Sequence, residues 1–375
     1  MPELVVVAEQ LLAPVPGGTA RYTRELVRAL AATAPENWEV STVVARHADP
    51  GSAIVPGANG PRVLSLPRRA LTAAWEQGLP LWPGGDSVHA PTPLAPPRAK
   101  RGRSLVVTVH DTVPWTHPET LTRRGASWHQ RMITRAVSRA DAIVVPTAAV
   151  AADLRRHAPG PVDVQVIGEG VPASLSAPTE TTREAVVRRL DVPRRYLLAV
   201  GTVEPRKGLD VLIKALADVE DVPLLVVGAQ GWGGVDLTAL ARAAGLDSGR
   251  VRHFGAVTDA DLGVLLHGAS ALVAPSQAEG FGLPVLEAMA AGVPVVHSDA
   301  PALVEVAGGA GISVPRNDSA ALARAVRTVL TDSARAAEMI EAGRLRAQDH
   351  SWERAAQLAW QVHQRCYAAA RAKIT

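Results

Sequence analysis

Two glutamates and one basic pair are the residues of this chain whose types and spacing suggest chemistry. Glu279 directly precedes a Gly-Phe-Gly, and Glu287 follows eight positions later in the run SQAEGFGLPVLEA. Arg206 and Lys207 stand side by side in VGTVEPRKG, although the chain strongly prefers arginine to lysine. Two fixed cations can neutralise a diphosphate, and carboxylates can accept hydrogen bonds from sugar hydroxyls. The set therefore predicts a site for a ligand that carries both kinds of group.

A strand, a glycine turn and a helix must position the two glutamates. ALVAPS (271–276) is typical of a buried strand, QAEGFG of a turn, and Pro284 of a first helical position, with Gly292 ending that helix. Glu287 then lies on the helix, roughly 5 Å along its axis from Pro284. The free N–H groups at the helix start favour an anion there. Glu287 could bind a ribose and Glu279 a second sugar, with the anionic group between them. A ligand with these three parts is a nucleotide-sugar.

Short β-branched runs alternate with helix-length segments in both halves of the chain. This rhythm predicts a parallel, helix-flanked sheet in each half. The Pro-rich, charged stretch 170–195 has the composition of a connection between them, and the chain from about Ser333 to Lys373 is predicted to be helical throughout. The predicted strands are 4–8, 40–45, 88–91, 104–110, 142–147 and 164–168 in the first half, and 196–201, 223–228, 251–257, 271–276 and 293–298 in the second.

Composition limits the class of protein. A chain of 375 residues predicts two domains, and 47% apolar with 20% charged residues is typical of a soluble globular enzyme. The single cysteine, Cys366, excludes an intrachain disulfide and fits a reducing cytoplasm. The first residues predict a strand rather than a signal peptide, because they have no basic leader. No apolar run approaches the ~18 residues of a membrane span. We therefore expect a cytoplasmic protein.

The net charge of +3 is too small to indicate nucleic-acid binding. The positive surplus lies in residues 1–175, with RAKRGR at 98–103 as its densest run. This half would be the one to meet an anionic surface, including a peripheral contact with a membrane. Solvated arginines on helices are the alternative explanation.

The loop after the first strand argues against a NAD-dependent dehydrogenase. The fingerprint G-x-G-x-x-G is absent there, and PVPGGTARYTREL stands in its place. Gly17 and Gly18 precede a helix from near Thr19, whose N-terminus is open to a phosphate, although any tight turn also uses two glycines. His110 ends a predicted central strand, and ligands bind at the carboxyl ends of the strands in open parallel sheets. His89 also ends a strand and is interpreted as structural.

An Asp-x-Asp at 259 to 261 has the form of a metal-binding motif. It stands in VTDADLGVLL, where Thr258 can cap a helix and Asp261 can complete a capping box. We therefore interpret these residues as a helix start and predict no metal site.

Taken together, these motifs resemble family-4-type retaining glycosyltransferases of the GT-B fold. The resemblance rests on EGFGLPVLE and on LLAVGTVEPRKGLDVLIKAL, VRHFGAVTDADL, VTVHDTVPWTHPE and PGGTARYTRELVRAL, which match that family in its order. The form GTVEPRKG is similar to bacterial mannosyltransferases that use GDP-mannose. The resemblance implies an α/β GT-B fold, in which two Rossmann-like domains with parallel sheets face each other across a cleft.

The resemblance also implies roles for individual residues. His110 would contact the donor hexose near the reacting carbon, Arg206 and Lys207 the diphosphate, and Glu279 the hexose. Val257, at the end of a predicted strand, is our prediction for a backbone contact to the base. The resemblance implies metal-independent catalysis without a cofactor. The predicted catalytic residues are His110, Glu279, Arg206 and Lys207, and the predicted donor-binding residues are Gly17, Gly18, Val257, Gly280, Phe281, Gly282, Leu283 and Glu287.

The predicted domains are 1–172, for the acceptor, and 173–352, for the donor. A helix at about 353–373 is expected to pack back on the first domain, as in the family, and to form a second tether of a hinge. The predicted function is hexose transfer from a nucleotide diphosphate sugar, with retention, to a hydroxyl acceptor in glycan or glycolipid synthesis, lipid-linked acceptors included. GDP-mannose and an α-mannosyltransferase are favoured, and UDP- and dTDP-sugars stay open. The alternatives are a sugar-nucleotide epimerase or phosphorylase on the same fold, or a non-catalytic glycosyltransferase subunit.

Overall fold

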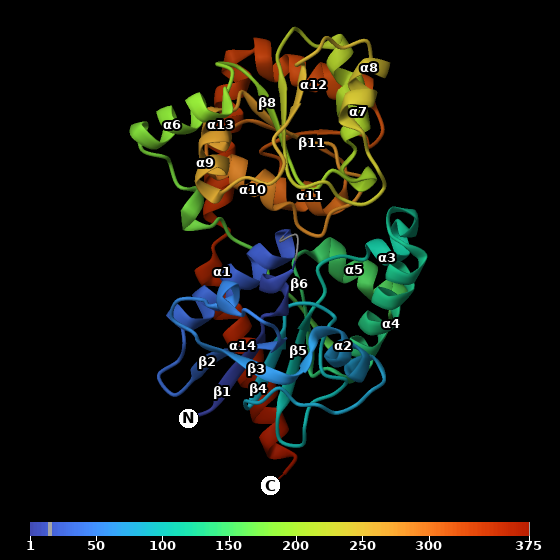
Figure 1. Ribbon diagram of the computed structural model, residues 1–375, viewed down its shortest axis with the longest axis vertical. Helices are drawn as coiled ribbons and strands as arrows, with labels where there is room; N and C mark the ends of the chain where they lie inside the picture. The colour runs from blue at the N-terminus through green and yellow to red at the C-terminus, as the bar shows by residue number, and fades with distance from the viewer. Residues whose placement is uncertain (14–16, 375) are drawn as a thin grey trace. The chain divides into compact units, whose positions relative to one another are not determined.

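The structure is a computed structural model that describes residues 1–13 and 17–374. The chain forms two compact units, each built around its own sheet (Figure 1). The first unit consists of Met1–Pro118, Thr122–Glu169 and Trp352–Thr375, and the second of Glu119–Leu121 and Gly170–Ser351. The chain thus passes from the first unit to the second after Glu169, a few residues before the predicted boundary at 172.

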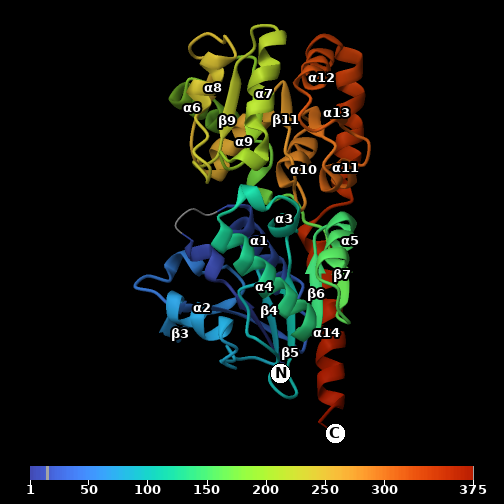
Figure 2. The ribbon, with the colours of Figure 1, turned by 90° about the vertical axis from the view of Figure 1, so that its right-hand side faces the viewer.

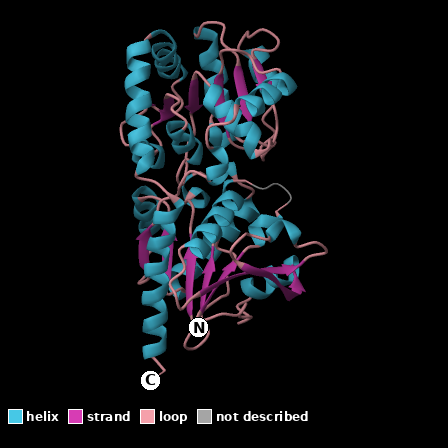
Figure 3. Ribbon diagram, turned by 90° about the vertical axis from the view of Figure 1, so that its left-hand side faces the viewer, coloured by secondary structure: helices cyan, strands magenta, loops and turns pink. Residues whose placement is uncertain are grey.

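The sheet of the first unit has seven parallel strands in the order β3-β2-β1-β4-β5-β6-β7. Its central strands are buried on both faces, as their near-continuous apolar runs predict. Figure 3 shows helices on both sides of these strands. The strands are β1 (Glu3–Val7), β2 (Glu39–Arg46), β3 (Asn59–Pro67), β4 (Ser87–Ala90), β5 (Ser104–Thr108), β6 (Ala142–Val145) and β7 (Asp163–Val166).

Two groups of helices cover this sheet. Helices α2 (Arg68–Glu76), α4 (Arg123–Arg139) and α5 (Ala148–His157) share one core with side chains of the strands. Helix α1 (Gly18–Ala32) packs against α14 (Trp352–Ala372), and α14 also contacts β5 (Figures 1 and 2). The last helix of the chain is thus part of the first unit, although the second unit precedes it in sequence. A short helix, α3 (Val113–Thr116), follows β5.

The sheet of the second unit has six parallel strands in the order β10-β9-β8-β11-β12-β13. Helices α7 and α12 pack on one core of this unit with side chains of the strands. The strands are β8 (Leu197–Val200), β9 (Leu224–Val227), β10 (Val251–His253), β11 (Ala271–Ala274), β12 (Val295–Ser298) and β13 (Ile312–Val314). The helices are α6 (Glu180–Leu190), α7 (Leu209–Ala215), α8 (Leu237–Ala243), α9 (Asp259–Gly268), α10 (Leu283–Ala290), α11 (Pro301–Ala307), α12 (Ser319–Thr331) and α13 (Ser333–Gln348).

The predicted fold class, two Rossmann-like domains with parallel sheets, is confirmed, and several element predictions need correction. Two edge strands, β3 and β13, were not predicted, because β3 contains Gly and Pro and is largely exposed, and β13 is only three residues long. The segment 170–195 is not only a connection, since it contains α6. The tail is not one continuous helix, because α13 ends at Gln348 and α14 begins at Trp352. In the described part of the chain, no helix is both long enough and apolar enough to cross a bilayer.

Candidate functional site

The candidate site of the second unit lies where its sheet reverses the direction of winding. From β8 the chain proceeds outward through β9 and β10, and it then returns to place β11 on the other side of β8. The loops after β8 and β11 therefore leave the carboxyl ends of neighbouring strands, which is where open parallel sheets bind ligands. Lys207 follows β8 and Glu279 follows β11. The topology thus joins two side chains that are 72 positions apart in sequence.

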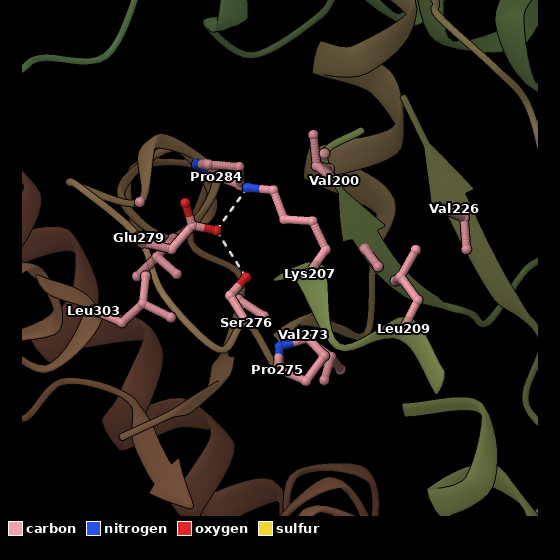
Figure 4. A pocket seen from close by; sticks show the side chains of 15 residues that line it. Val200, Lys207, Leu209, Val226, Val273, Pro275, Ser276, Glu279, Pro284 and Leu303 are labelled. Atoms are coloured by element: carbon pink, nitrogen blue, oxygen red, sulfur yellow. Dashed lines mark hydrogen bonds and ion pairs between the residues drawn. The ribbon is translucent and has the colours of Figure 1, made fainter. Parts of the chain in front are cut away.

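The carboxylate of Glu279 is the centre of a hydrogen-bonded cluster (Figure 4). Lys207 Nζ donates to Glu279 Oε1 at 2.6 Å, and Ser276 Oγ donates to the same oxygen at 2.7 Å. Arg206 Nη1 donates to Glu279 Oε2 at 3.0 Å. The side chains of Lys207, Arg206 and Glu279 are only 16%, 18% and 13% exposed. Such charge-assisted bonds, largely shielded from water, hold both cations in fixed positions.

The charges of this cluster balance within the protein. Burial by itself would raise the pKa of the Glu279 carboxyl, but the charges of Lys207 and Arg206 outweigh burial and lower this pKa to about 2. Arg206 also donates to the Glu204 carboxylate at 2.6 Å and to the Ala278 carbonyl at 2.7 Å. Two cations therefore face two carboxylates, and Glu279 stays ionised across the physiological pH range.

A small cavity adjoins the cluster, and Figure 4 shows its walls. Its volume of about 20 Å³ holds roughly one water molecule, and its lining includes Gly201, Lys207, Glu279 and Gly282. Gly201 has a φ of +151°, and a Cβ at this position would lie 3.1 Å from Lys207 Cε. A side chain there would press on the lysine, so glycine keeps Lys207 beside Glu279.

Helix α10 begins at one wall of this cavity. Its N-cap, Gly282, has a φ of +107°, and a Cβ there would collide with Leu303. Glu287 lies one turn into the helix and is 2% exposed, so its carboxylate is inside the protein rather than on a wet face. The ring of Phe281 packs edge-on against His350, with centroids 5.6 Å apart. Leu283 is also buried. Contacts from 280–283 to a ligand would therefore come from the backbone.

In the first unit, β5 ends at Thr108, so His110 lies two residues beyond the strand rather than at its end as predicted. Its Nε2 lies 2.7 Å from the carbonyl oxygen of Pro91, and its Nδ1 lies 3.9 Å from Glu169 Oε1. Burial lowers the pKa of His110, although the Pro91 bond and the charge of Asp111 oppose that effect. The side chain is 20% exposed, so a ligand can reach it.

Gly17 and Gly18 form the N-terminus of α1, and both are exposed. A Cβ added at either would meet open space among the residues that the structure describes. Residues 14–16 of the quoted motif PVPGG lie outside the described part of the chain. The glycines thus satisfy the steric condition for a close approach of a ligand.

The remaining candidates lie in the loop between β10 and α9. The strand ends at His253, so Val257 is not at a strand end as predicted but in the loop before α9. Thr258 caps α9 by accepting from the Asp261 N–H at 3.2 Å. Asp259 accepts from Ser174 Oγ at 2.8 Å, and Asp261 pairs with Arg189. The predicted helix start and its Thr258 cap are confirmed, but the Asp261 carboxylate pairs with Arg189 instead of completing the predicted capping box.

Several residues beside the candidates were not predicted from the sequence. Glu204 and Ser276 complete the Glu279 cluster, and the GTVEPRKG and APSQAEG motifs contain both. In the first unit, the ring of Tyr22 meets the ring of His110 edge-on, with centroids 4.6 Å apart. Buried Glu169 follows β7 and faces the same imidazole. The signal that could have found Glu169 is a charged residue at the carboxyl end of a predicted strand.

Two family models match the chain. Residues 16–175 match a model described as Glycosyltransferase Family 4, and residues 181–346 match one described as Glycosyl transferases group 1. The chain is 31% identical over 277 residues to O-antigen chain mannosyltransferase B of Escherichia coli, which covers 71% of this chain and 70% of that protein. It is 34% identical over 239 residues to D-inositol 3-phosphate glycosyltransferase of Salinispora tropica, of which it spans 49%.

Solved structures show the same fold. Sucrose-phosphate synthase from Thermosynechococcus elongatus superposes with a TM-score of 0.77 at 24% identity, over 98% of this chain and all of that one. Anabaena HepE, solved in complex with UDP-glucose, superposes with a TM-score of 0.73 at 19% identity, over 97% of this chain and 99% of that one.

Proposed function

This chain belongs to the family-4, group 1 glycosyltransferases of the GT-B fold, and from that membership we propose that it transfers a hexose from a nucleotide diphosphate sugar to a hydroxyl group, with retention of the anomeric configuration. The observation that carries the proposal is the cluster of Arg206, Lys207 and Glu279 at the switch point of the second sheet. Mannose from GDP-mannose is the favoured donor, because of GTVEPRKG and the Escherichia coli relative.

The two cations would bind the diphosphate of the donor. This group leaves as the glycosidic bond breaks, so its negative charge grows in the transition state. Arg206 and Lys207 are already fixed by hydrogen bonds, and preorganised charges stabilise such a state without reorganisation. They would perform the role that a bound metal has in other transferases, so we propose a metal-independent reaction without a cofactor.

The carboxylates would bind the hydroxyl groups of the donor. Glu279 is proposed to accept from the hexose, and Glu287 from the ribose after a small movement of its buried side chain. The backbone of residues 280–283 and the loop at Val257 would complete the donor site, with Gly17 and Gly18 against the diphosphate. His110 is proposed to contact the hexose. The acceptor would attack from the face of the leaving group, and a phosphate oxygen of that group would take its proton.

A panel of nucleotide-sugars tests the proposal. At about 100 times its dissociation constant a donor stabilises its site by ~2.7 kcal/mol, which raises the melting temperature of a unit of this size by roughly 5–10 °C. We expect GDP-mannose to give the largest shift among GDP-, UDP- and dTDP-sugars. With that donor, a lipid or glycan acceptor and EDTA, NMR of the product should show the anomeric configuration of the donor.

The same panel can contradict the proposal. A product with inverted configuration would exclude retention, and complete loss of transfer in EDTA with recovery in Mg²⁺ would exclude metal independence. Conversion of the sugar without an acceptor would indicate an epimerase, and a requirement for inorganic phosphate would indicate a phosphorylase. No shift with any nucleotide-sugar would indicate a subunit without donor binding.

We also propose that the first unit contacts an anionic membrane surface, where a lipid-linked acceptor would be found. A hollow of about 830 Å³ lies in this unit beside β3. Leu81 is exposed at its edge, and Arg98, Lys100 and Arg101 carry positive charge there. Apolar walls beside basic side chains suit an amphiphile with an anionic head. The apolar lining consists of Leu64, Leu66, Leu71, Pro80, Leu81, Trp82 and Ala99.

Vesicle sedimentation tests this contact. Each basic residue near an anionic bilayer contributes about 1 kcal/mol, so changing Arg98, Lys100 and Arg101 together to glutamate should weaken binding by roughly two orders of magnitude or more. The double variant Arg155→Glu with Arg156→Glu, at two exposed positions of α5, is the control and should bind nearly as the parent does. Equal binding of the parent to neutral and anionic vesicles would contradict the proposal.

A further inference from the structure

A chain of buried hydrogen bonds crosses the interior of the first unit, and the proposed function does not use it. It begins in the sheet, passes through His363 on α14 and ends at Tyr22 on α1. All six side chains are at most 3% exposed. The successive contacts are Ser104 Oγ to Ser87 Oγ at 2.7 Å, Ser87 Oγ to His363 Nδ1 at 2.7 Å, His363 Nε2 to His89 Nδ1 at 2.9 Å, His89 Nε2 to Thr108 Oγ1 at 2.9 Å, and Thr108 Oγ1 to Tyr22 OH at 3.2 Å.

Burying polar side chains costs free energy, so the presence of this hydrogen-bonded chain in the interior requires an explanation. An apolar side chain at position 363 would suit the face that α14 presents with Ala356, Ala359 and Trp360. Each buried polar atom instead needs a partner, because an unmade bond in the interior costs about 1–3 kcal/mol. Buried polar networks whose members are all satisfied fix one arrangement of the groups that they join.

One assignment of the protons satisfies the chain as far as Tyr22. Burial lowers the pKa of His89 to about 3, and burial together with the charge of His89 lowers the pKa of His363, so both imidazoles are neutral near pH 7. Each ring then has one N–H. Ser104 donates to Ser87. Ser87 can then donate to His363 Nδ1, and His363 Nε2–H to His89.

The same assignment continues to Tyr22. His89 Nε2–H can then donate to Thr108, and the Thr108 hydroxyl can donate to the oxygen of Tyr22. Every proton before Tyr22 therefore has an acceptor in one arrangement of the chain.

Tyr22 connects this chain to the candidate site. Its ring meets His110 at 4.6 Å and an interplanar angle of 88°. The same ring contacts Trp352, the first residue of α14, with centroids 5.7 Å apart. Helix α14 thus reaches Tyr22 at two points, directly through Trp352 and indirectly through His363.

We propose that His363 is a positioning residue for the transfer reaction, which acts through His89 and Thr108 to fix Tyr22 and thereby the ring of His110. This inference rests on the proposed function, because it assumes that His110 contacts the donor. His363 is fully buried, so it would act without contact to a substrate. Its contribution is the orientation of an imidazole in another part of the same unit.

Two substitutions at position 363 test the proposal in the full-length protein. The amide nitrogen of glutamine can stand near the position of Nε2, so His363→Gln keeps a donor for His89. The shorter side chain of His363→Asn reaches only toward Ser87 and breaks the link to His89. The control is Trp360→Phe, which removes another buried hydrogen bond of the same helix, from Trp360 Nε1 to the Leu30 carbonyl at 3.1 Å.

We expect His363→Asn to lower kcat roughly tenfold, within the range of couplings through a shared network, with little change in the donor KM. His363→Gln should recover most of this loss, and Trp360→Phe should show little of it. In ¹⁵N NMR spectra the imidazole signals of His110 should move in His363→Asn and stay in the other two variants. If His363→Asn does not fold, Thr108→Val cuts the chain without changing α14 and should give the same loss.

Equal losses of kcat in all three variants would show that His363 only stabilises the helix, and this would overturn the proposal. Unchanged His110 signals in a folded variant with a broken chain would overturn it as well. The NMR measurement needs no turnover. A parent protein that transfers no sugar would therefore contradict the proposed function, while the link from His363 to His110 would still be measured.

Discussion

Replacing Lys207 by alanine is expected to lower turnover by roughly two to three orders of magnitude, the usual effect of removing one preorganised group that stabilises developing charge. Lys207 Nζ is 2.6 Å from Glu279 Oε1, and the residue lines the small cavity at the switch point. The variant would lose a charge on the proposed leaving group. It would also leave Glu279 with Arg206 as its one remaining cation in the cluster.

The control for this prediction is Lys214→Ala, which removes an exposed lysine from α7 in the same unit. Initial rates at saturating donor should separate the two variants, and circular dichroism should show that both remain folded. Because Glu279 loses a partner in Lys207→Ala, the melting temperature should fall slightly in that variant alone. If Lys207→Ala keeps activity within a few-fold of the parent, the cation is not part of the reaction.

Truncating the chain before Ser351 is expected to abolish transfer and to destabilise the first unit. The deletion removes α14, whose buried residues include Trp352, Trp360 and Val362. Burial of each large apolar side chain contributes about 1.5–3 kcal/mol, so the loss approaches the 5–15 kcal/mol that stabilises a typical domain. It also exposes the core side of α1, which packs on α14.

Calorimetry of this truncation should show one transition lowered or lost and one retained. The second unit keeps all its strands, so it should still bind a nucleotide, more weakly than the intact chain does. The control is a truncation after Ala372, which leaves α14 complete. Full activity and an unchanged melting profile in the longer deletion would show that α14 is dispensable.

The sequence predicted those parts of the fold that depend on local pattern. Buried strands such as β5 and β9 are short apolar runs between turn signals, and the helix after GFGLP has clear start and stop residues. The edge strands β3 and β13 were missed, β3 because it is largely exposed and its sequence therefore lacks an apolar run, and β13 because it is only three residues long. The break between α13 and α14 was missed because Asp349, His350 and Ser351 do not include a Pro or Gly.

Site residues that belong to a sequence motif were predictable. Contacts that tertiary packing creates between distant residues were not. Arg206, Lys207 and Glu279 were found from their types, and the parallel-sheet topology explains why they meet. That Glu279 holds both cations could not be read from the spacing, because it depends on how two distant loops approach. The link from His363 to His89 joins residues 274 positions apart, and an isolated histidine in a helix gives no signal of such a partner.

The balance of charges around Glu279 has a consequence for selectivity. An anion that draws Arg206 and Lys207 toward itself weakens the bonds of a carboxylate that is only 13% exposed. A ligand that has negative charge but no hydroxyl group donates no hydrogen bond to Glu279. A buried carboxylate with too few hydrogen bonds is unfavourable. A ligand that brings hydroxyl groups together with its phosphates restores the lost bonds. Under the proposed roles, inorganic phosphate and bare nucleotides therefore bind less well to the unit than a nucleotide-sugar does, because they leave the Glu279 carboxylate without hydrogen-bond donors.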